Sequence, residues 1–122
     1  MHEMSIASAV VEQVAREAER RGATAATAVR VEIGELAGVV PDALAFCFGL
    51  ACAGTVLEGA ELETVAIPAR ARCDPCGVTW APGLPPDLLC PRCAGATAEL
   101  LSGRELRIRE VAWADGAERV HG

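Results

Sequence analysis

Four of the six cysteines stand in two Cys-x-x-Cys pairs, Cys73 with Cys76 and Cys90 with Cys93, separated by thirteen residues. Two such pairs supply the four thiolates that tetrahedral Zn²⁺ takes in zinc ribbons, because each two-residue gap lets one turn place both sulfur atoms on one ion. A closed set of four ligands leaves no open position for a substrate, so we expect a structural zinc ion. Iron takes the same ligands, and the spacing does not distinguish the two metals.

The segment that carries these pairs, residues 69–98, is rich in Pro, Gly and Cys and has few large apolar residues. A bound metal must therefore supply much of its folding free energy. Four thiolates leave a net negative charge around the ion, and we expect Arg72 and Arg92 to offset part of it. Redox dithiol chemistry is the alternative for a lone Cys-x-x-Cys, but two pairs at ribbon spacing disfavour it.

Cys47 and Cys52 lie five residues apart in an apolar stretch, outside this pattern. A free cysteine in such surroundings behaves as a small hydrophobic residue. We therefore predict that these two are buried side chains and not metal ligands.

The amino-terminal residues Met1, His2 and Glu3 form a second group with metal-binding chemistry. An α-amine has a pKa of about 7.7–8.0 and an imidazole of about 6.5, so both become neutral donors near physiological pH. The amine, the next backbone nitrogen and the His2 imidazole form fused chelate rings, and the backbone nitrogen or carboxylate of Glu3 completes four donors. A planar, nitrogen-rich set suits Ni²⁺ or Cu²⁺. By composition alone, a start methionine followed by a solvated polar dipeptide explains the same residues.

The composition is that of a globular protein: 122 residues, 52% hydrophobic and 23% charged, with 3% aromatic residues. The net charge is −6, and all eleven basic residues are Arg. Binding to phosphate needs clustered basic residues, so this charge argues against a nucleic-acid partner.

Targeting and membrane signals are not visible. Charged residues begin at Glu3, so the first residues contain no apolar run of the kind found in a secretory signal peptide. The apolar run 36–57 is interrupted by Pro41 and Asp42 and falls short of the roughly 20 residues that span a membrane, so we predict a buried helix there. Six cysteines without a secretion signal indicate a reducing cytoplasm.

Hydrophobic periodicity predicts an α+β fold. Residues with a helical period alternate with short strand-like runs, and the sheet is interrupted by the Cys-rich insertion. We predict a small domain with two helices and a three-stranded mixed sheet, carrying an inserted zinc-ribbon module. The predicted elements are a helix over 5–21, a strand over 28–36, a helix from Pro41 to near Gly54, and strands over 61–67 and 105–113.

This pattern divides the chain into three parts. Residues 1–68 with 102–113 form a predicted α+β domain that contains Met1, His2 and Glu3, and residues 69–101 form the predicted zinc-ribbon domain. Residues 114–122 are polar and are predicted to be a flexible tail.

In combination, the motifs resemble the HypA family of hydrogenase maturation factors, also called hydrogenase/urease nickel incorporation proteins. The segments that carry the resemblance occur in order almost to Trp113: Met1-His2-Glu3-Met4-Ser5, Glu32-Ile33-Gly34-Glu35-Leu36, Gly54-Thr55-Val56-Leu57-Glu58-Gly59-Ala60, the four paired Cys, and Ser102-Gly103-Arg104-Glu105-Leu106.

The resemblance implies a nickel metallochaperone of the cytoplasm that is a monomer or a weak homodimer. We expect it to catalyse no reaction and to bind neither nucleic acid nor membranes. Met1, His2 and Glu3 would hold Ni²⁺, and the ribbon would hold zinc. A GTPase partner would help to pass nickel to the [NiFe]-hydrogenase large subunit.

Two positions depart from the family pattern. Some members carry an acidic residue where this chain has Val40, and Asp42 is the nearest carboxylate, so we expect no side-chain ligand from this loop. Ala94 stands between the second Cys pair and Gly95, which reduces the conformational freedom of that turn.

The alternative functions are weaker. A zinc-ribbon adaptor or nucleic-acid module fits the ribbon but not the acidic charge. An enzyme is disfavoured because the two imidazoles, His2 and His121, have no evident nucleophile beside them, and the zinc ligand set is closed.

Overall fold

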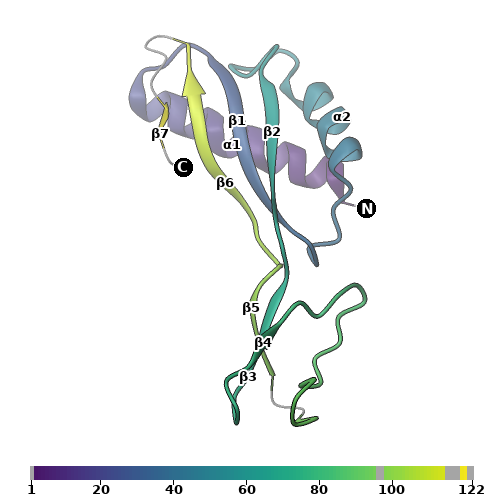
Figure 1. Ribbon diagram of the computed structural model, residues 1–122. Helices are drawn as coiled ribbons and strands as arrows, with labels where there is room; N and C mark the ends of the chain where they lie inside the picture. The colour runs from purple at the N-terminus through teal and green to yellow at the C-terminus, as the bar shows by residue number, and fades with distance from the viewer. Residues whose placement is uncertain (1, 96–97, 115–118, 121–122) are drawn as a thin grey trace. The chain divides into compact units, whose positions relative to one another are not determined.

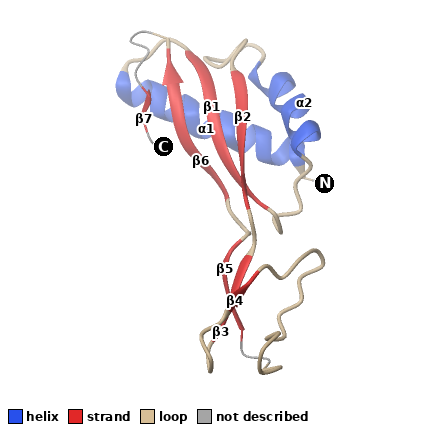
Figure 2. Cartoon of the chain, in the orientation of Figure 1, coloured by secondary structure: helices blue, strands red, loops and turns tan. Residues whose placement is uncertain are grey.

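The computed structural model describes residues 2–95, 98–114 and 119–120, which form two helices and seven strands (Figures 1 and 2). In chain order these are α1 (Glu3–Arg21), β1 (Ala26–Gly34), α2 (Pro41–Cys52), β2 (Glu61–Ile67), β3 (Arg70–Cys73), β4 (Thr79–Trp80), β5 (Ala98–Ser102), β6 (Leu106–Trp113) and β7 (Arg119–Val120).

The chain divides into two compact units. Residues 1–31, 39–65 and 107–122 form one, which we call the helical unit, and residues 32–38 and 66–106 form the other, the cysteine unit. Two helices with two small sheets confirm the predicted α+β fold with an inserted cysteine module.

The helical unit packs its two helices together and buries an aliphatic core against the sheet. In Figure 1, α1 crosses behind β1 and β6. Its largest side chains with less than 2% exposure are Phe48, Leu44, Leu57, Val14, Val29, Val31 and Cys52. With few aromatic residues in the chain, Val and Leu fill most of this core, as the composition predicts.

Helix α1 begins at Glu3 and not at residue 5, where the predicted helix begins. His2 occupies the N-cap position without a capping hydrogen bond from its side chain. The helix starts earlier because Glu3 is itself buried, so the first turn is held by tertiary contacts that periodicity does not reveal. At the other end, Gly22 ends the helix with φ of 67°, as predicted.

Helix α2 begins with Pro41 at its first turn, as predicted, because the fixed φ of proline suits that position. Leu44, Phe48 and Cys52 form its buried face. Within the described residues, no helix is both long enough and apolar enough to cross a membrane.

The larger sheet has the strand order β2-β1-β6-β7. The Glu35 N–H donates to the Ile67 carbonyl just past the ends of β1 and β2. The Gly34 N–H, at the end of β1, donates to the Glu105 carbonyl just before β6. Strand β1 is therefore parallel to β2 and antiparallel to β6, which makes the sheet mixed.

One charged cluster links three strands of this sheet. The Arg30 guanidinium of β1 lies 3.0 Å from the Glu63 carboxylate of β2 and 2.7 Å from the Glu110 carboxylate of β6. Glu110 is buried in this arrangement. In the sequence, Glu110 interrupts the alternation of apolar and polar residues along β6. Its ion pair with Arg30 explains why a charged residue is buried at this position.

The sheet has a fourth strand that the sequence did not predict. Strand β7 pairs antiparallel with β6, with Val111 opposite Val120 and Ala112 opposite Arg119. Two residues are too few to show an alternating pattern, which is why this strand escaped prediction. The predicted flexibility of residues 114–122 concerns a segment of which 115–118 and 121–122 lie outside the described residues.

The cysteine unit is built on a three-stranded antiparallel sheet with the order β4-β3-β5. Ser102 donates a 2.8 Å hydrogen bond from its hydroxyl to the Pro68 carbonyl, which joins the segments entering and leaving the unit. The Ala69 N–H donates to the Glu35 carboxylate at 2.9 Å.

Two glycines allow three backbone segments of this unit to meet. A Cβ added to Gly34 would overlap the backbone of Gly103 and Arg104, and a Cβ added to Gly103 would lie 2.8 Å from Ala69. Gly103 also has φ of 122°, a conformation that L side chains rarely adopt.

We predict that Gly34→Ala lowers the free energy of unfolding by about 1–3 kcal/mol or more, because the new methyl group displaces the Gly103 backbone. Thermal unfolding of metal-loaded protein, followed by circular dichroism, measures the loss. Gly49→Ala is the matched control, since a Cβ there meets nothing within 4 Å. That substitution should raise stability by up to about 1 kcal/mol. Equal effects of both variants would contradict the predicted overlap.

Candidate metal centres

The structure brings the four paired cysteines together. Cys73 ends β3, Cys76 follows in the next turn, and Cys90 and Cys93 come from a second turn. Their sulfur atoms all lie within 4.8 Å of one another. The Cys73 and Cys93 Sγ atoms are 3.6 Å apart, as are those of Cys76 and Cys90.

These distances fit a shared metal ion and not disulfides. A disulfide requires a sulfur separation of about 2.05 Å. Four thiolates at the usual zinc–sulfur distance of about 2.3 Å form a tetrahedron with edges of about 3.8 Å. The sulfur atoms are therefore nearly placed for tetrahedral coordination. Among the described residues, this is the cluster of His, Cys, Asp or Glu side chains arranged to hold a metal.

The two cysteine turns share one backbone pattern. The Gly77 N–H donates to the Cys73 carbonyl at 2.8 Å, and the Ala94 N–H donates to the Cys90 carbonyl at 2.9 Å. Gly77 has φ of 75° and Ala94 has φ of 59°. Ala94 is thus the counterpart of Gly77, and its methyl group strains a conformation that favours glycine. Ala94 is therefore the residue at which the predicted loss of conformational freedom occurs in this turn.

Backbone N–H groups support the sulfur atoms as well. The amides of Arg92 and Cys93 both donate to the Cys90 Sγ, at 3.4 Å each. Burial raises the pKa of Cys90, but these amides and the Cys76 and Cys93 side chains lower it to about 6. These hydrogen bonds favour the thiolate form of Cys90, which is the form that binds a metal cation.

Cys73 has the opposite tendency. The Cys76 N–H lowers its pKa, but burial and the neighbouring cysteine side chains raise it to about 12. Several thiolates crowded in one place repel each other, so protons remain on part of the cluster until a cation displaces them. A divalent ion that binds all four sulfurs removes this repulsion.

Arg72, which was expected to offset part of the thiolate charge, lies opposite Glu99 in the antiparallel register, and their side chains form an ion pair. Its effect on the charge of the thiolates stays a prediction. Arg92 acts on the cluster through its backbone amide, which donates to Cys90.

Few buried apolar side chains surround the four-cysteine cluster. In the cysteine unit, the buried hydrophobic residues between 66 and 95 are Ala69, Ala71, Cys73 and Cys90. Trp80 is held at the surface by a 3.0 Å hydrogen bond from its indole N–H to the Asp87 carbonyl. Metal coordination is accordingly the main interaction available to order this segment.

Cys47 and Cys52 lie on α2, outside the metal cluster. Cys52 is buried in the core of the helical unit, and burial raises the pKa of its thiol. Cys47 is only half-buried, so the prediction of burial holds fully for Cys52 alone.

Of the predicted nickel residues, the structure describes His2 and Glu3, and Met1 lies outside the described residues. The His2 side chain is exposed and makes no capping hydrogen bond. Its carbonyl accepts the Ile6 N–H at 2.9 Å, so its backbone is fixed by the first helical turn.

The Glu3 side chain turns inward and is 7% exposed. Its Oε2 accepts the N–H of Val40 at 3.1 Å. The amino-terminal charge, with the backbone N–H groups of Val40 and Glu3, lowers the pKa of Glu3 to about 2. The carboxylate therefore joins the start of α1 to the start of α2, a link over 37 residues that no local pattern could reveal.

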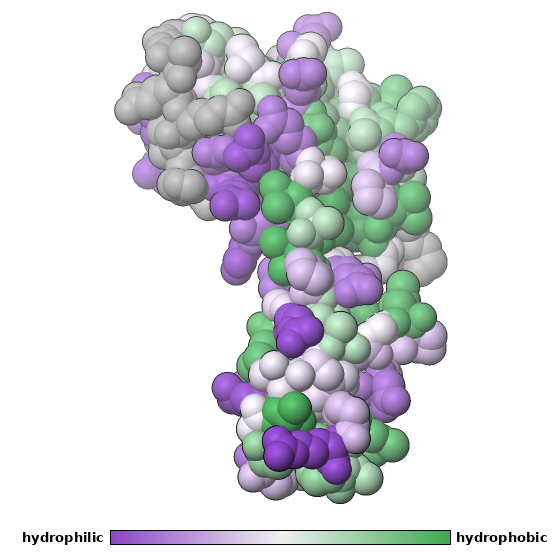
Figure 3. All heavy atoms as spheres, in the orientation of Figure 1, coloured by the Kyte–Doolittle hydropathy of each residue, from purple (hydrophilic) through white to green (hydrophobic). Residues whose placement is uncertain are grey.

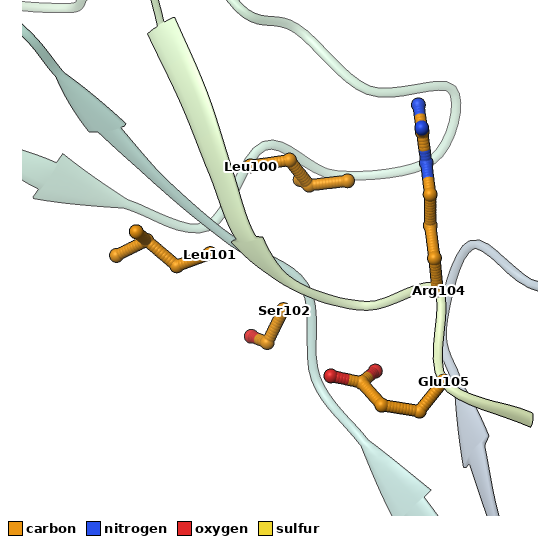
Figure 4. A pocket seen from close by; sticks show the side chains of 5 residues that line it. All are labelled: Leu100, Leu101, Ser102, Arg104 and Glu105. Atoms are coloured by element: carbon orange, nitrogen blue, oxygen red, sulfur yellow. The ribbon is translucent and has the colours of Figure 1, made fainter. Parts of the chain in front are cut away.

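A hollow of about 330 Å³ is lined by Leu100, Leu101, Ser102, Arg104 and Glu105, none of which is a predicted metal ligand (Figure 4). Figure 4 shows the Glu105 carboxylate turned toward Ser102. That carboxylate accepts the Gly103 N–H at 2.8 Å, and the hollow contains no metal-ligating cluster. It is therefore not a candidate metal site.

The fold and the sulfur cluster together define a metal-binding α+β protein with an inserted cysteine module. Over residues 1–113 the chain matches the family described as "Hydrogenase/urease nickel incorporation, metallochaperone, hypA". This chain belongs to the HypA family.

Curated relatives agree. The chain is 61% identical to "Hydrogenase maturation factor HypA" of Streptomyces avermitilis, over 99% of this chain and 92% of that protein. It is 40% identical to the protein of the same name from Chlorobium limicola, over 95% and 99%.

Solved structures share the fold. The solution structure of the Ni metallochaperone HypA from Helicobacter pylori aligns with a TM-score of 0.66 at 22% identity, over 91% of this chain and 96% of that one. A second solution structure of a HypA protein aligns with a TM-score of 0.69 at 23% identity, over 91% and 94%.

We predict that Cys73→Ser reduces the bound metal of the purified chain by about tenfold or more, because it removes one of four ligands. Elemental analysis measures the metal. Hydrogen exchange should show lost protection over residues 70–95 and retained protection in α1 and α2. Cys47→Ser, which changes a cysteine outside the cluster, is the control and should keep its metal. An ordered, metal-free cysteine unit in Cys73→Ser would refute the prediction.

Proposed function

We propose that this chain binds Ni²⁺ at its amino terminus and delivers it during [NiFe]-hydrogenase maturation. Its place in a nickel incorporation family supports this proposal. The observation that carries the site is the exposed His2 imidazole directly before the first turn of α1. A metal carrier needs such an accessible donor, because its cargo must arrive and leave.

The proposed nickel ligands are the Met1 amine, the backbone nitrogen and imidazole of His2, and the backbone nitrogen of Glu3. Glu3 is the first residue of α1, where a backbone N–H has no carbonyl partner within the helix. That nitrogen can therefore be given to a metal without breaking the helix. Four nitrogen donors in one plane suit Ni²⁺.

The Glu3 carboxylate has a different role in this proposal. Because it accepts the Val40 N–H, it holds the chelating segment at a defined place beside α2. Of the two donors that Glu3 offers, the backbone nitrogen is the one that we propose for nickel. The side chain orients the ligands, as outer-shell groups commonly do.

We assign zinc to the Cys73, Cys76, Cys90 and Cys93 cluster, with a structural role. The near-tetrahedral spacing of the four sulfurs supports zinc, because structural zinc sites with four cysteine ligands are almost always tetrahedral. Once bound by four thiolates, the ion has no position for a substrate. Its contribution is to fold the cysteine unit.

Delivery requires partners, which we propose to be the GTPase of the same maturation route and the large subunit of the hydrogenase, in the cytoplasm. In this division of labour, residues 1–68 with 102–113 carry nickel and residues 69–101 carry zinc. The chain itself then catalyses no reaction.

The decisive experiment removes the amine without shifting the register of His2. We expect amino-terminal acetylation to weaken Ni²⁺ binding at pH 7 to 8 by about a hundredfold or more, because an amide nitrogen is a far poorer donor than an amine. His2→Ala should have a similar effect, with zinc content and helicity unchanged. Isothermal titration of untagged protein measures both.

His121→Ala, at the other histidine, is the matched control and should bind nickel as the unchanged chain does. Nickel affinity should also fall toward pH 6, because protons compete with the metal for its nitrogen donors. Equal affinity of the acetylated and free chains would place nickel elsewhere and defeat the proposed site.

Asp42 provides a separate test of the loop. It is exposed in the first turn of α2, where the helix dipole favours a carboxylate. Asp42→Asn should therefore leave the nickel affinity within about twofold, against the tenfold or greater loss typical of a ligand-supporting group. Isothermal titration calorimetry measures the nickel affinity of this variant. A tenfold loss of affinity would indicate that Asp42 is a nickel ligand.

A further inference from the structure

Strand β5 of the cysteine unit has one open edge. The smaller sheet has the order β4-β3-β5, so within the described residues no strand pairs with the side of β5 that faces away from β3. An edge strand exposes unpaired backbone N–H and C=O groups, and proteins usually protect such an edge by charges, by proline or by keeping the strand short. Strand β4, at the opposite edge of the sheet, has two residues, whereas β5 has five and contains no proline.

The side chains of β5 do not protect this edge either. The charged residue of the strand, Glu99, forms an ion pair with Arg72 of β3, so its charge is already partnered within the sheet. Leu101 is apolar, yet its side chain is 45% exposed. Strand β5 therefore offers both free backbone groups and an uncovered apolar side chain to an extended chain.

The hollow shown in Figure 4 lies along this open edge. Leu100 and Leu101 both line it, although consecutive strand residues point to opposite faces of a sheet. Figure 4 shows these two side chains on opposite sides of the strand. A hollow that is lined from both faces lies at a strand edge, and none of its described lining residues belongs to β3. Its volume of about 330 Å³ is at the small end of the range of ligand pockets, roughly 300–1,000 Å³, and suits a few side chains of an extended segment.

Arg104 brings a positive charge to the hollow. Its side chain is exposed, and within the described residues it has no ion pair or hydrogen bond. The other polar side chains of the lining already have partners. The Ser102 hydroxyl donates to the Pro68 carbonyl, and the Glu105 carboxylate accepts a backbone N–H of its own turn. In Figure 4, the Arg104 side chain extends away from the Glu105 carboxylate. An unpaired guanidinium favours a carboxylate, which it binds through two parallel N–H groups.

We propose that the open edge of β5 binds an extended, acidic segment of another protein, which adds to the smaller sheet as a further strand. The backbone groups of β5 pair with this segment, Arg104 binds one of its carboxylates, and Leu101 contacts one of its apolar side chains. In strand addition, main-chain hydrogen bonds supply affinity and side-chain contacts supply specificity.

The surface of the cysteine unit agrees with such a mixed mode of recognition. In Figure 3, hydrophobic and hydrophilic residues are interspersed over the face of this unit that is in view. Apolar contact alone would favour a continuous hydrophobic patch. The proposal concerns the cysteine unit and does not depend on the proposed nickel site.

Selection on the full, metal-loaded chain from a displayed library of random peptides of about seven residues, a usual strand length, tests the proposal. We expect the enriched peptides to carry an Asp or Glu at a fixed distance from an apolar residue. Each enriched peptide is then synthesised, and its affinity is measured by fluorescence anisotropy. Hydrogen exchange of the complex should show new protection over residues 99–102.

Methylation of alternate backbone nitrogens of the peptide distinguishes strand addition from other modes of binding. The N–H groups of a strand point alternately to its two edges, so the edge that faces β5 uses every second one. Methyl groups on those nitrogens should abolish binding, and methyl groups on the intervening nitrogens should leave it within about twofold.

Substitution of Arg104 tests the charge. Arg104→Glu should weaken the enriched peptides by about tenfold or more, because like charges then meet. Replacing the acidic residue of the peptide by Lys should restore its affinity for Arg104→Glu and lower its affinity for the unchanged chain. Arg16→Glu makes the same charge change at an exposed arginine that does not line the hollow, and it is the matched control. Circular dichroism and metal analysis verify that each variant is folded.

The proposal would be overturned by a library without enriched sequences, by peptides that bind Arg104→Glu as tightly as the unchanged chain, or by protection that maps outside β5. Equal effects of the two methylation patterns would also overturn it. So would a dimer that pairs β5 with β5 of a second copy, detected by sedimentation and hydrogen exchange of the chain alone, because the chain itself would then occupy the edge.

Discussion

The close backbone contact among Gly34, Ala69 and Gly103 is the constraint on which the insertion of the cysteine unit depends. The chain leaves the larger sheet after Ile67 and must return at Leu106 in register for β6. Hydrogen bonds from Glu35 to Ile67, from Gly34 to Glu105 and from Leu36 to Gly103 hold the leaving and returning segments beside the end of β1. Without side chains at positions 34 and 103, these backbones approach closely enough to form that set.

The cysteine unit itself is ordered by a different interaction. Its apolar interior is small, and its β4 strand has two residues, so burial contributes little to its stability. The sulfur cluster compensates through coordination, with backbone amides directed at Cys90 and two similar turns that hold the pairs. The second turn holds Ala94 at φ of 59°, a strained conformation for a residue with a side chain.

In the helical unit, function and packing meet at Glu3. A carboxylate is a common metal ligand, yet here it is buried and accepts the Val40 N–H. The same side chain thus connects α1 to α2 and fixes the residues proposed to bind nickel. For the proposed nickel site, this contact would hold the backbone of Glu3 in place before the metal arrives, while the His2 side chain is exposed to solvent.

Local patterns in the sequence were sufficient for the α+β class, both helices, the three longer strands of the main sheet and the four clustered cysteines. These depend on periodicity, on glycine and proline at helix ends and on the short spacing of paired ligands, all of which act over a few residues. Only the tertiary structure revealed β7, the start of α1 at Glu3, the Arg72–Glu99 ion pair and the exposure of Phe46 on α2. Each of these depends on which residues meet across long stretches of chain, or on which side of a helix stays uncovered. Side-chain type and spacing do not contain that information until the chain is folded.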